Sequence, residues 1–217
     1  MKKTLLLLAL IAGSLLSANA EDHLTALLKP GDAVLGIQLK NADAYTAFQM
    51  DITLPDGMTL STDADAVSIQ RQGEAAPHTV ASNVLDNGAL RVLAYSYKEA
   101  GETKTGNESF TDSKGDLLLL KVNVEGECTV SNLGISNVEF VKTEGLASTE
   151  LGVTAKGKLG DANNDNRVNL TDAQLILQHF VGNTPSVFVE EAADVDYSAT
   201  INLTDAQKTV QIFVGNY

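Results

Sequence analysis

Two stretches of twelve residues near the C-terminus carry oxygen-bearing side chains at matching positions. Residues 161–172 read DANNDNRVNLTD and residues 194–205 read DVDYSATINLTD, so the first, third, fifth, ninth and twelfth positions are all Asp, Asn or Ser. Calcium prefers about six to eight hard oxygen ligands, and a short loop surrounds the ion when its side chains converge from alternate positions. The spacing therefore predicts two Ca2+ ions, one in each dodecamer, which we name loop 1 and loop 2.

Each loop offers the same order of expected ligands. Side-chain oxygens come from the first, third, fifth and twelfth positions and a backbone carbonyl from the seventh, while the Asn at the ninth acts through a water or caps the following helix. In loop 1 these residues are Asp161, Asn163, Asp165, Arg167, Asn169 and Asp172. In loop 2 they are Asp194, Asp196, Ser198, Thr200, Asn202 and Asp205.

The two loops differ at two positions that matter for calcium. Ser198 supplies a neutral hydroxyl where loop 1 has the carboxylate of Asp165. The sixth position usually needs a left-handed backbone, for which Asn166 is better suited than Ala199. We therefore expect loop 2 to bind calcium more weakly than loop 1.

Helix capping offers a second explanation for part of the pattern. Asn169 precedes the helical run LTDAQLILQHF, and Asp172 three residues later resembles the acidic member of a capping box. Capping accounts for the ninth and twelfth positions of the loop but not for the first, third and fifth. The metal-binding interpretation accounts for all five.

The two loops belong to an internal duplication. Residues 161–183 and 194–216 share twelve identities in twenty-three positions, including the block NLTDAQ and the ending Phe-Val-Gly-Asn. The segments GDANNDNRVNLTDAQLILQHFVG and ADVDYSATINLTDAQKTVQIFVG resemble the two repeats of a type I dockerin, over residues 158–217. An EF-hand fits less well because no helix precedes loop 1 and Asp, not Glu, ends each loop.

The resemblance to dockerins implies a partner and a binding surface. Dockerins are secreted calcium modules that bind cohesin domains through residues just inside each helix. In this chain those positions carry Leu170, Thr171, Leu203 and Thr204. Because the pairs are identical, the resemblance implies that a cohesin-type partner docks in two orientations. The alternative is that the two leucines pack inside the module.

The first half of the chain predicts a different kind of domain. From about residue 34 to residue 153 it consists of short alternating runs such as FQMDITL, separated by turn signals such as Pro-Asp-Gly. This pattern predicts an all-β antiparallel sandwich, jelly-roll or cohesin-like, followed by the small all-α calcium module. The stretch IQLKNADAYTAFQMDITLPDGM is similar to the opening strands of cohesin-like and carbohydrate-binding sandwiches.

The ends and the charge of the chain bound its location. Residues 1–20 read as a signal peptide, with two lysines before an apolar run too short to span a bilayer, so we expect a secreted or cell-surface protein without a membrane span. The net charge is −13 and becomes −15 once the two lysines of the signal peptide are removed, which argues against nucleic acid as a partner. The predicted domains are the signal peptide, a sandwich at 21–153, a linker at 154–157 and the dockerin at 158–217.

These features favour a non-catalytic secreted adaptor, in polysaccharide utilisation or cell-surface assembly, that docks onto a cohesin-type partner. A cohesin-like sandwich would also allow head-to-tail self-association. One alternative is a carbohydrate-binding module that binds polysaccharide through Tyr45, Tyr95 and Tyr97, although the chain has no Trp. A small glycoside hydrolase is less favoured because no acidic pair stands out as catalytic, and we predict no catalytic residue.

Calcium is expected to drive folding of the C-terminal module. Each pair of like charges at 4 Å costs on the order of 1 kcal/mol in water and about 4 kcal/mol at an effective dielectric near 20, and a segment of this size has little core to offset that. Circular dichroism of residues 158–217 should therefore show helicity rising as calcium is added. Full helicity in excess chelator would contradict this expectation.

Overall fold

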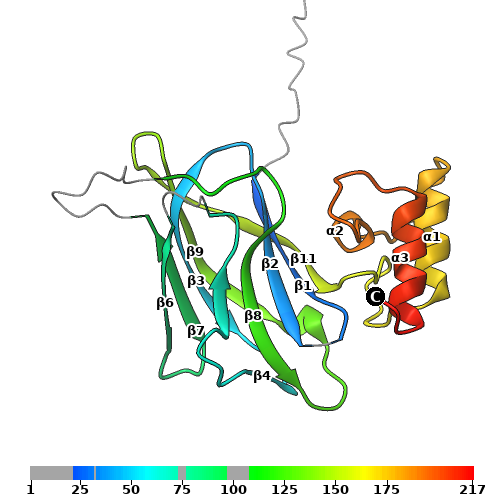
Figure 1. Cartoon of the computed structure of the whole chain (residues 1–217), viewed down its shortest axis with the longest axis horizontal. Helices are drawn as coiled ribbons and strands as arrows, with labels where there is room; N and C mark the ends of the chain where they lie inside the picture. Colours follow the sequence, from blue (N-terminus) through cyan, green and yellow to red (C-terminus); the bar gives the residue numbers. More distant parts are fainter. Residues whose placement is uncertain (1–21, 32, 73–76, 97–107) are drawn as a thin grey trace, which may run out of the picture.

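The computed structural model describes residues 22–31, 33–72, 77–96 and 108–217. Figure 1 shows a β-sandwich with a helical module at one end. The strands are β1 (His23–Leu28), β2 (Val34–Lys40), β3 (Tyr45–Thr53), β4 (Met58–Leu60), β5 (Val67–Ile69), β6 (Thr79–Val84), β7 (Leu90–Tyr95), β8 (Asp116–Val124), β9 (Gly134–Lys142), β10 (Ser148–Glu150) and β11 (Gly152–Lys158). The helices are the 3-10 turn η1 (Val130–Asn132), α1 (Leu170–Phe180), α2 (Glu190–Ala193) and α3 (Leu203–Phe213).

The predicted fold class, a sandwich followed by a small helical module, is confirmed. One sheet has the order β11-β1-β2-β8-β4, with β5 also paired to β8, and the other has the order β10-β9-β3-β7-β6. Residues 1–20, predicted as a signal peptide, lie outside the described part of the chain. Within the described ranges, no helix has both the length and the apolar character needed to cross a membrane.

Alternating apolar side chains form the core between the two sheets. Phe48, Met50 and Ile52 of β3 are 1%, 0% and 0% exposed and belong to the same buried cluster as Leu118 and Leu120 of β8. Burial of each such side chain contributes roughly 1.5–3 kcal/mol. The alternation that predicted strands is thus the alternation that fills the core.

The expected linker at residues 154–157 is instead the second half of β11. This strand runs parallel to β1, from His23 opposite Gly152 to Leu28 opposite Lys158. The short sequence Thr-Ala-Lys-Gly suggested a linker, but pairing with β1 satisfies backbone groups along one edge of the strand. The helical module therefore follows directly from a strand of the sandwich.

The helical module packs against the sandwich through an apolar cluster. Leu27 of β1 and Leu159 after β11 contact Ala192 and Val195 of the module, and all four are at most 2% exposed. Leu159 also donates its N–H to the carbonyl of Leu28 at 2.9 Å. This junction fixes which side of the module faces the sandwich and which side faces solvent.

A partly buried ion pair connects strands of the second sheet. Asp51 of β3, which is 4% exposed, accepts hydrogen bonds from Arg91 Nε at 2.7 Å and Nη2 at 2.8 Å, and from Asn137 Nδ2 of β9 at 2.6 Å. The hydrogen bonds from Arg91 lower the pKa of Asp51 to about 2, aided by Asn137 and opposed by burial. The charged form of Asp51 is therefore the form that the fold stabilises.

Replacing Asp51 by Asn is expected to lower the free energy of unfolding at neutral pH, because Arg91 loses its charged partner. The pKa of about 2 lies below the ordinary value of 3.8, so this stabilisation is fully present above pH 4 and disappears as the pH falls through 2. Denaturant unfolding of both proteins at pH 7, 4 and 2.5 should show a difference that shrinks with acid. A difference independent of pH would contradict this role of Asp51.

Candidate metal centre

The acidic side chains of loop 2 form a cluster that fits a divalent cation. One carboxylate oxygen from each of Asp194, Asp196 and Asp205 lies within 4.8 Å of the other two. Calcium–oxygen distances of about 2.3–2.6 Å place ligand atoms within about 5 Å of one another. Across the described part of the chain, no other group of three His, Cys, Asp or Glu side chains meets this condition.

Backbone donors hold these carboxylates in place but leave one oxygen unsatisfied. Asp205 accepts N–H groups from Asn202 at 2.9 Å and Asp196 at 3.3 Å, and Asp194 Oδ2 accepts the N–H of Ala199 at 3.0 Å. Asp194 is only 2% exposed, and its Oδ1 has no hydrogen-bond partner among the described residues. A buried carboxylate oxygen without a donor is costly, and a bound cation would remove that cost.

The electrostatics of loop 2 also favour binding of a cation. Asp205 is fully buried. Burial raises its pKa above the ordinary value of 3.8, and the negative charges of Asp196 and Asp194 raise it further, against the lowering effect of the backbone hydrogen bonds. A calcium ion would favour the charged form of the same group.

Loop 1 begins with a buried aspartate in a comparable position. Asp161 is 1% exposed, and it accepts N–H groups from Asp165 at 3.0 Å and Asn166 at 2.7 Å. Burial raises the pKa of Asp161 to about 6, with a further contribution from the charge of Asp172. Burial likewise raises the pKa of Asp172. Loop 1 therefore also concentrates negative charge in a desolvated space.

The middle of loop 1 is arranged differently from that of loop 2. Asn163 Nδ2 donates to Asp165 Oδ2 at 3.0 Å, and Asn163 Oδ1 accepts the N–H of Asp165 at 3.0 Å. These two side chains pair with each other, whereas the acids of loop 2 form a group of three. The ligand roles assigned to loop 1 and the lower affinity expected for loop 2 stay predictions.

The residues expected to offer backbone carbonyls lie within the loops as local hydrogen-bond partners. The N–H of Arg167 donates to Asp165 Oδ1 at 2.9 Å. The carbonyl of Thr200 accepts from Ser198 Oγ at 3.1 Å and from Asn202 Nδ2 at 2.9 Å. The loop thus places the Thr200 oxygen and the Ser198 hydroxyl side by side, and their roles as ligands remain predictions.

The ninth positions cap the helices, which was one of the two roles expected for them. Asn169 accepts the N–H of Thr171 at 2.8 Å, and Asn202 accepts the N–H of Thr204 at 2.8 Å. Asp172 completes a capping box by accepting the N–H of Asn169 at 2.9 Å. The acid at position twelve therefore joins each loop to the first turn of its helix.

The backbone conformation of the loops confirms the left-handed sixth position and shows a second left-handed position. The sixth positions are left-handed, with φ of 70° at Asn166 and 63° at Ala199. The fourth positions are left-handed too, with φ of 55° at Asn164 and 59° at Tyr197, which the sequence analysis missed. Two left-handed residues within three consecutive positions turn the loop sharply enough for its early side chains to converge, and the strain is greater for Ala199 than for Asn166.

The helix faces expected to bind a partner are exposed. Leu170 is 57% exposed and Leu203 is 51% exposed, and the neighbouring Thr171 and Thr204 are exposed as well. The alternative in which the leucines pack inside the module is therefore wrong. The buried cluster inside the module consists instead of other residues, such as Ile176.

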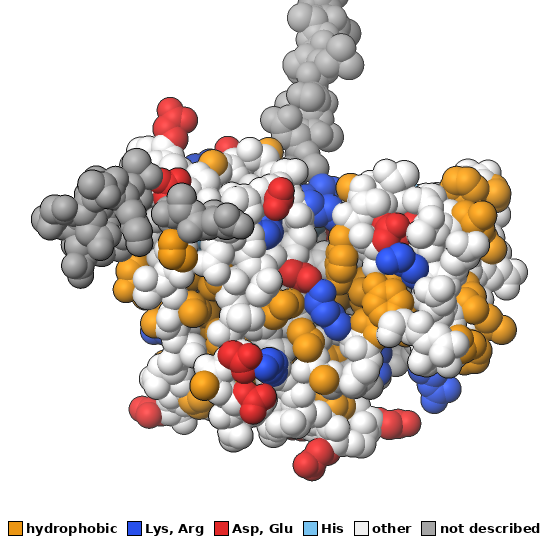
Figure 2. Space-filling model, viewed as in Figure 1, with side chains coloured by type: hydrophobic (Ala, Val, Ile, Leu, Met, Phe, Trp, Pro, Cys, Tyr) orange, Lys and Arg blue, Asp and Glu red, His pale blue; other side chains and the backbone are white. Residues whose placement is uncertain are grey.

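The exposed apolar surface extends to the other end of both helices, which the sequence analysis did not assign. Phe180 and Phe213 are 53% and 49% exposed, and Val181 and Val214 are 75% and 54% exposed. Figure 2 shows hydrophobic side chains gathered on the outer side of the helical module. The repeated Phe-Val-Gly-Asn ending was the signal that could have identified them.

The tyrosines considered for sugar binding do not form a common platform in the described residues. Tyr45 is 1% exposed and donates its hydroxyl to Asp22 at 2.6 Å, while Tyr95 is half-buried in β7. Tyr97 lies outside the described residues. Tyr45 is thus a core residue.

Comparison with protein families identifies one domain of the chain. Residues 159–209 match the family model of the dockerin type I domain. The chain therefore carries a type I dockerin, as its sequence led us to expect. No curated protein matches.

The sandwich is similar in fold to solved cohesin modules. A non-cellulosomal cohesin from Archaeoglobus fulgidus has 14% identity over 63% of this chain and 89% of its own, with a TM-score of 0.41. The cohesin module of a Clostridium perfringens family 33 glycoside hydrolase has 11% identity over 62% and 96%, with a TM-score of 0.43. A type III cohesin from the cell-surface anchoring scaffoldin of Ruminococcus flavefaciens has 11% identity over 63% and 86%, with a TM-score of 0.41.

Protons are expected to compete with calcium at loop 1. Because the pKa of Asp161 is about 6, roughly nine of ten such groups carry a proton at pH 5, and binding must displace it. Calcium affinity at loop 1 should fall about tenfold between pH 7.5 and pH 5, measured by calorimetry on the whole chain. The variant Asp161→Asn serves as control, since the remaining binding should lack this component. Equal affinity of loop 1 at both pH values would contradict the assignment.

Proposed function

We propose that this protein is a non-catalytic, calcium-dependent adaptor. Its dockerin binds a cohesin-type domain through the exposed faces of α1 and α3, and it thereby attaches the sandwich to an extracellular or cell-surface assembly. Type I dockerins generally bind calcium, and the cluster of Asp194, Asp196 and Asp205 supports the same cofactor here. Polysaccharide utilisation is the setting that the sequence resemblance suggests.

One observation carries the proposal: equivalent apolar side chains of both repeats face solvent. Leu170 and Leu203 differ by only six percentage points in exposure, and so are equally available to a partner. Solvent-exposed leucines at matching positions of two packed helices have no role in the core of the module. Exposed apolar side chains gathered on one side of a module mark a protein interaction site.

The same faces carry almost no charge, which suits a desolvated interface. Within α1 the only acidic residue is Asp172, and within α3 it is Asp205, and both are fully buried in the loops. Lys208 is the only Lys or Arg in either helix. A partner that covers α1 would therefore not need to bury an unpaired charge.

The capping boxes would couple calcium binding to the conformation of this surface. Asp172 accepts the N–H of Asn169, and Asp205 accepts the N–H of Asn202, one residue before the exposed leucines. A cation that holds the two carboxylates also holds the first turn of each helix. Removing calcium should therefore loosen the surface that the partner recognises.

The proposal predicts a calcium-dependent interaction that survives the loss of one face. The whole chain should bind a member of a panel of purified cohesin domains, measured by surface plasmon resonance with calcium and with chelator. Leu170→Asp and Leu203→Asp should each reduce affinity less than about threefold, because the other face remains. The double variant should lose at least about thirtyfold, the effect of removing a central apolar contact.

The control variant is Val84→Asp, which alters an apolar side chain of β6 that is 59% exposed on the sandwich. It should bind as the unmodified chain does. Light scattering at increasing concentration adds a second test, because calcium-dependent growth of oligomers would identify a second copy as the partner. A double variant that binds normally would contradict the docking surface.

A further inference from the structure

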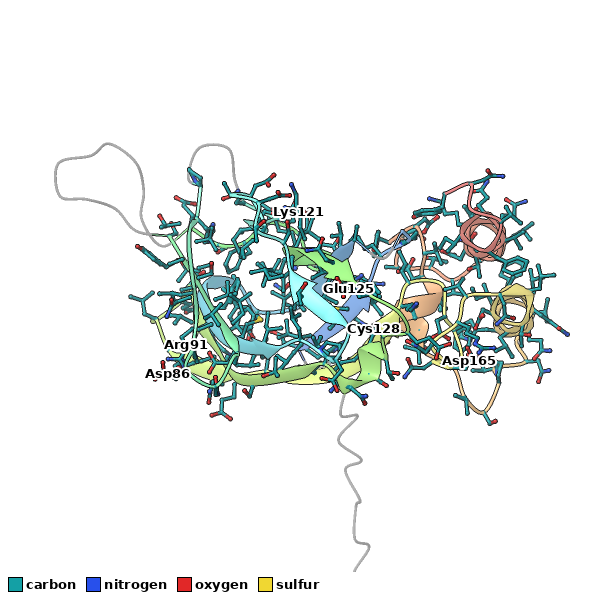
Figure 3. The ribbon with its side chains drawn as sticks, turned by 90° about the horizontal axis from the view of Figure 1, so that it is seen from below. Asp86, Arg91, Lys121, Glu125, Cys128 and Asp165 are labelled. Atoms are coloured by element: carbon teal, nitrogen blue, oxygen red, sulfur yellow. The ribbon has the colours of Figure 1, made fainter. Side chains whose placement is uncertain are left out.

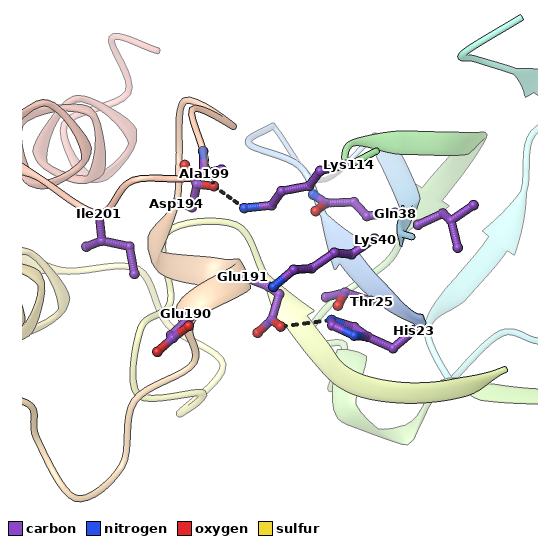
Figure 4. A pocket seen from close by; sticks show the side chains of 11 residues that line it. His23, Thr25, Gln38, Lys40, Lys114, Glu190, Glu191, Asp194, Ala199 and Ile201 are labelled. Atoms are coloured by element: carbon purple, nitrogen blue, oxygen red, sulfur yellow. Dashed lines mark hydrogen bonds and ion pairs between the residues drawn. The ribbon is translucent and has the colours of Figure 1, made fainter. Parts of the chain in front are cut away.

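The sandwich and loop 2 meet at a small cavity that several charged side chains line. Figure 4 shows Lys114 and Lys40 reaching into it from the sandwich, with Asp194 and Glu191 on the side of the helical module. His23 Nε2 and Glu191 Oε1 are 3.2 Å apart across the same boundary. Asp194, the first expected calcium ligand of loop 2, therefore lines this junction.

Lys114 forms an ion pair with that ligand. Its ammonium contacts Asp194 Oδ2, and the side chains are 22% and 2% exposed. Lys114 lies in the segment just before β8, eighty residues from Asp194 in sequence. Tertiary packing thus places a positively charged side chain of the sandwich against loop 2.

The two oxygens of Asp194 have different surroundings. Oδ2 accepts from both Lys114 and the N–H of Ala199, whereas Oδ1 is buried without a partner in the described residues. Asp194 also contributes an oxygen to the cluster with Asp196 and Asp205. Oδ1 is therefore the oxygen of Asp194 that lacks a hydrogen-bond partner in the described part of the chain, while Oδ2 is paired with Lys114.

Loop 1 touches the sandwich in another way. Asn166 Nδ2 donates to the carbonyl of Cys128 at 2.8 Å, a contact without charge. Figure 3 shows Cys128 and Asp165 near each other where loop 1 approaches the sandwich. Asn166 of loop 1 and Asp194 of loop 2 thus meet different groups of the sandwich.

We propose that Lys114 is a residue of the outer coordination sphere that lowers the calcium affinity of loop 2 and links calcium binding to the junction between the modules. The inference rests on the calcium binding put forward under the proposed function. It adds a residue of the sandwich, outside the dockerin, to the determinants of that site.

Two electrostatic effects of Lys114 act in the same direction. Without calcium, its charge offsets the repulsion among the three carboxylates of loop 2 and so stabilises the metal-free loop. With calcium on Oδ1, the same ammonium lies close to the ion and repels it. Since coupling is reciprocal, calcium at loop 2 must weaken the contribution of Lys114 to the junction by the same factor.

The test is a calcium titration of the whole chain and of Lys114→Met, by calorimetry or by competition with a chromophoric chelator. Affinity at loop 2 should increase on the order of tenfold, while affinity at loop 1 should not change. Lys114→Arg keeps the charge and should resemble the unmodified chain. Lys40→Met removes a neighbouring lysine of the same cavity that is not the partner of Asp194, and it should also leave both affinities unchanged.

Thermal unfolding gives a second readout. Lys114→Met should lower the melting temperature in chelator and lower it less in calcium, so that calcium stabilises the variant more than the unmodified chain. Unchanged or weaker calcium binding at loop 2 of Lys114→Met would overturn the inference. The variant Asp194→Asn identifies which part of the calcium titration comes from loop 2. If the unmodified chain shows no such part, the proposed calcium function itself fails.

Discussion

Burial of aspartate charge at the start of two helices is the constraint on which the helical module depends. Asp161, Asp172, Asp194 and Asp205 are between 0% and 2% exposed. Backbone N–H groups satisfy most of their oxygens, but desolvated carboxylates so close together require a positive charge nearby. The fold supplies one such charge at Lys114, and in the proposed function calcium supplies the others. The capped helices, the sharp loop turns and the exposed leucine face all follow from how these acids are held.

The loops could be predicted from sequence because their information is local. Twelve consecutive residues contain the expected ligands, the cap and the left-handed turn, and the capping boxes at Asn169 and Asn202 follow from the same spacing. The sandwich could be predicted because alternation along β3 places Phe48 and Met50 on one face. What depends on neighbours within one element was visible in the sequence.

What depends on distant parts of the chain was not visible. Residues 154–157 suggested a linker because nothing in their sequence shows that β1 offers them a free edge. The pairing of Lys114 with Asp194 spans eighty residues and arises only when β11 brings the module against the sandwich. Exposure of Phe180 and Phe213 was missed because an apolar residue at a helix end is as consistent with a core as with a docking surface.

The duplication makes the two halves of the dockerin alike on the outside and unlike on the inside. On the outer side, Leu170 and Leu203 present the same side chain at nearly the same exposure. On the inner side, Asn166 meets a backbone carbonyl, whereas Asp194 meets an ammonium group. A sandwich that is not itself two-fold symmetric cannot contact both loops identically. The two sites are therefore expected to fill at different calcium concentrations even though the two exposed helix faces match. Symmetric recognition of a partner and an asymmetric response to calcium are thus compatible in one small module.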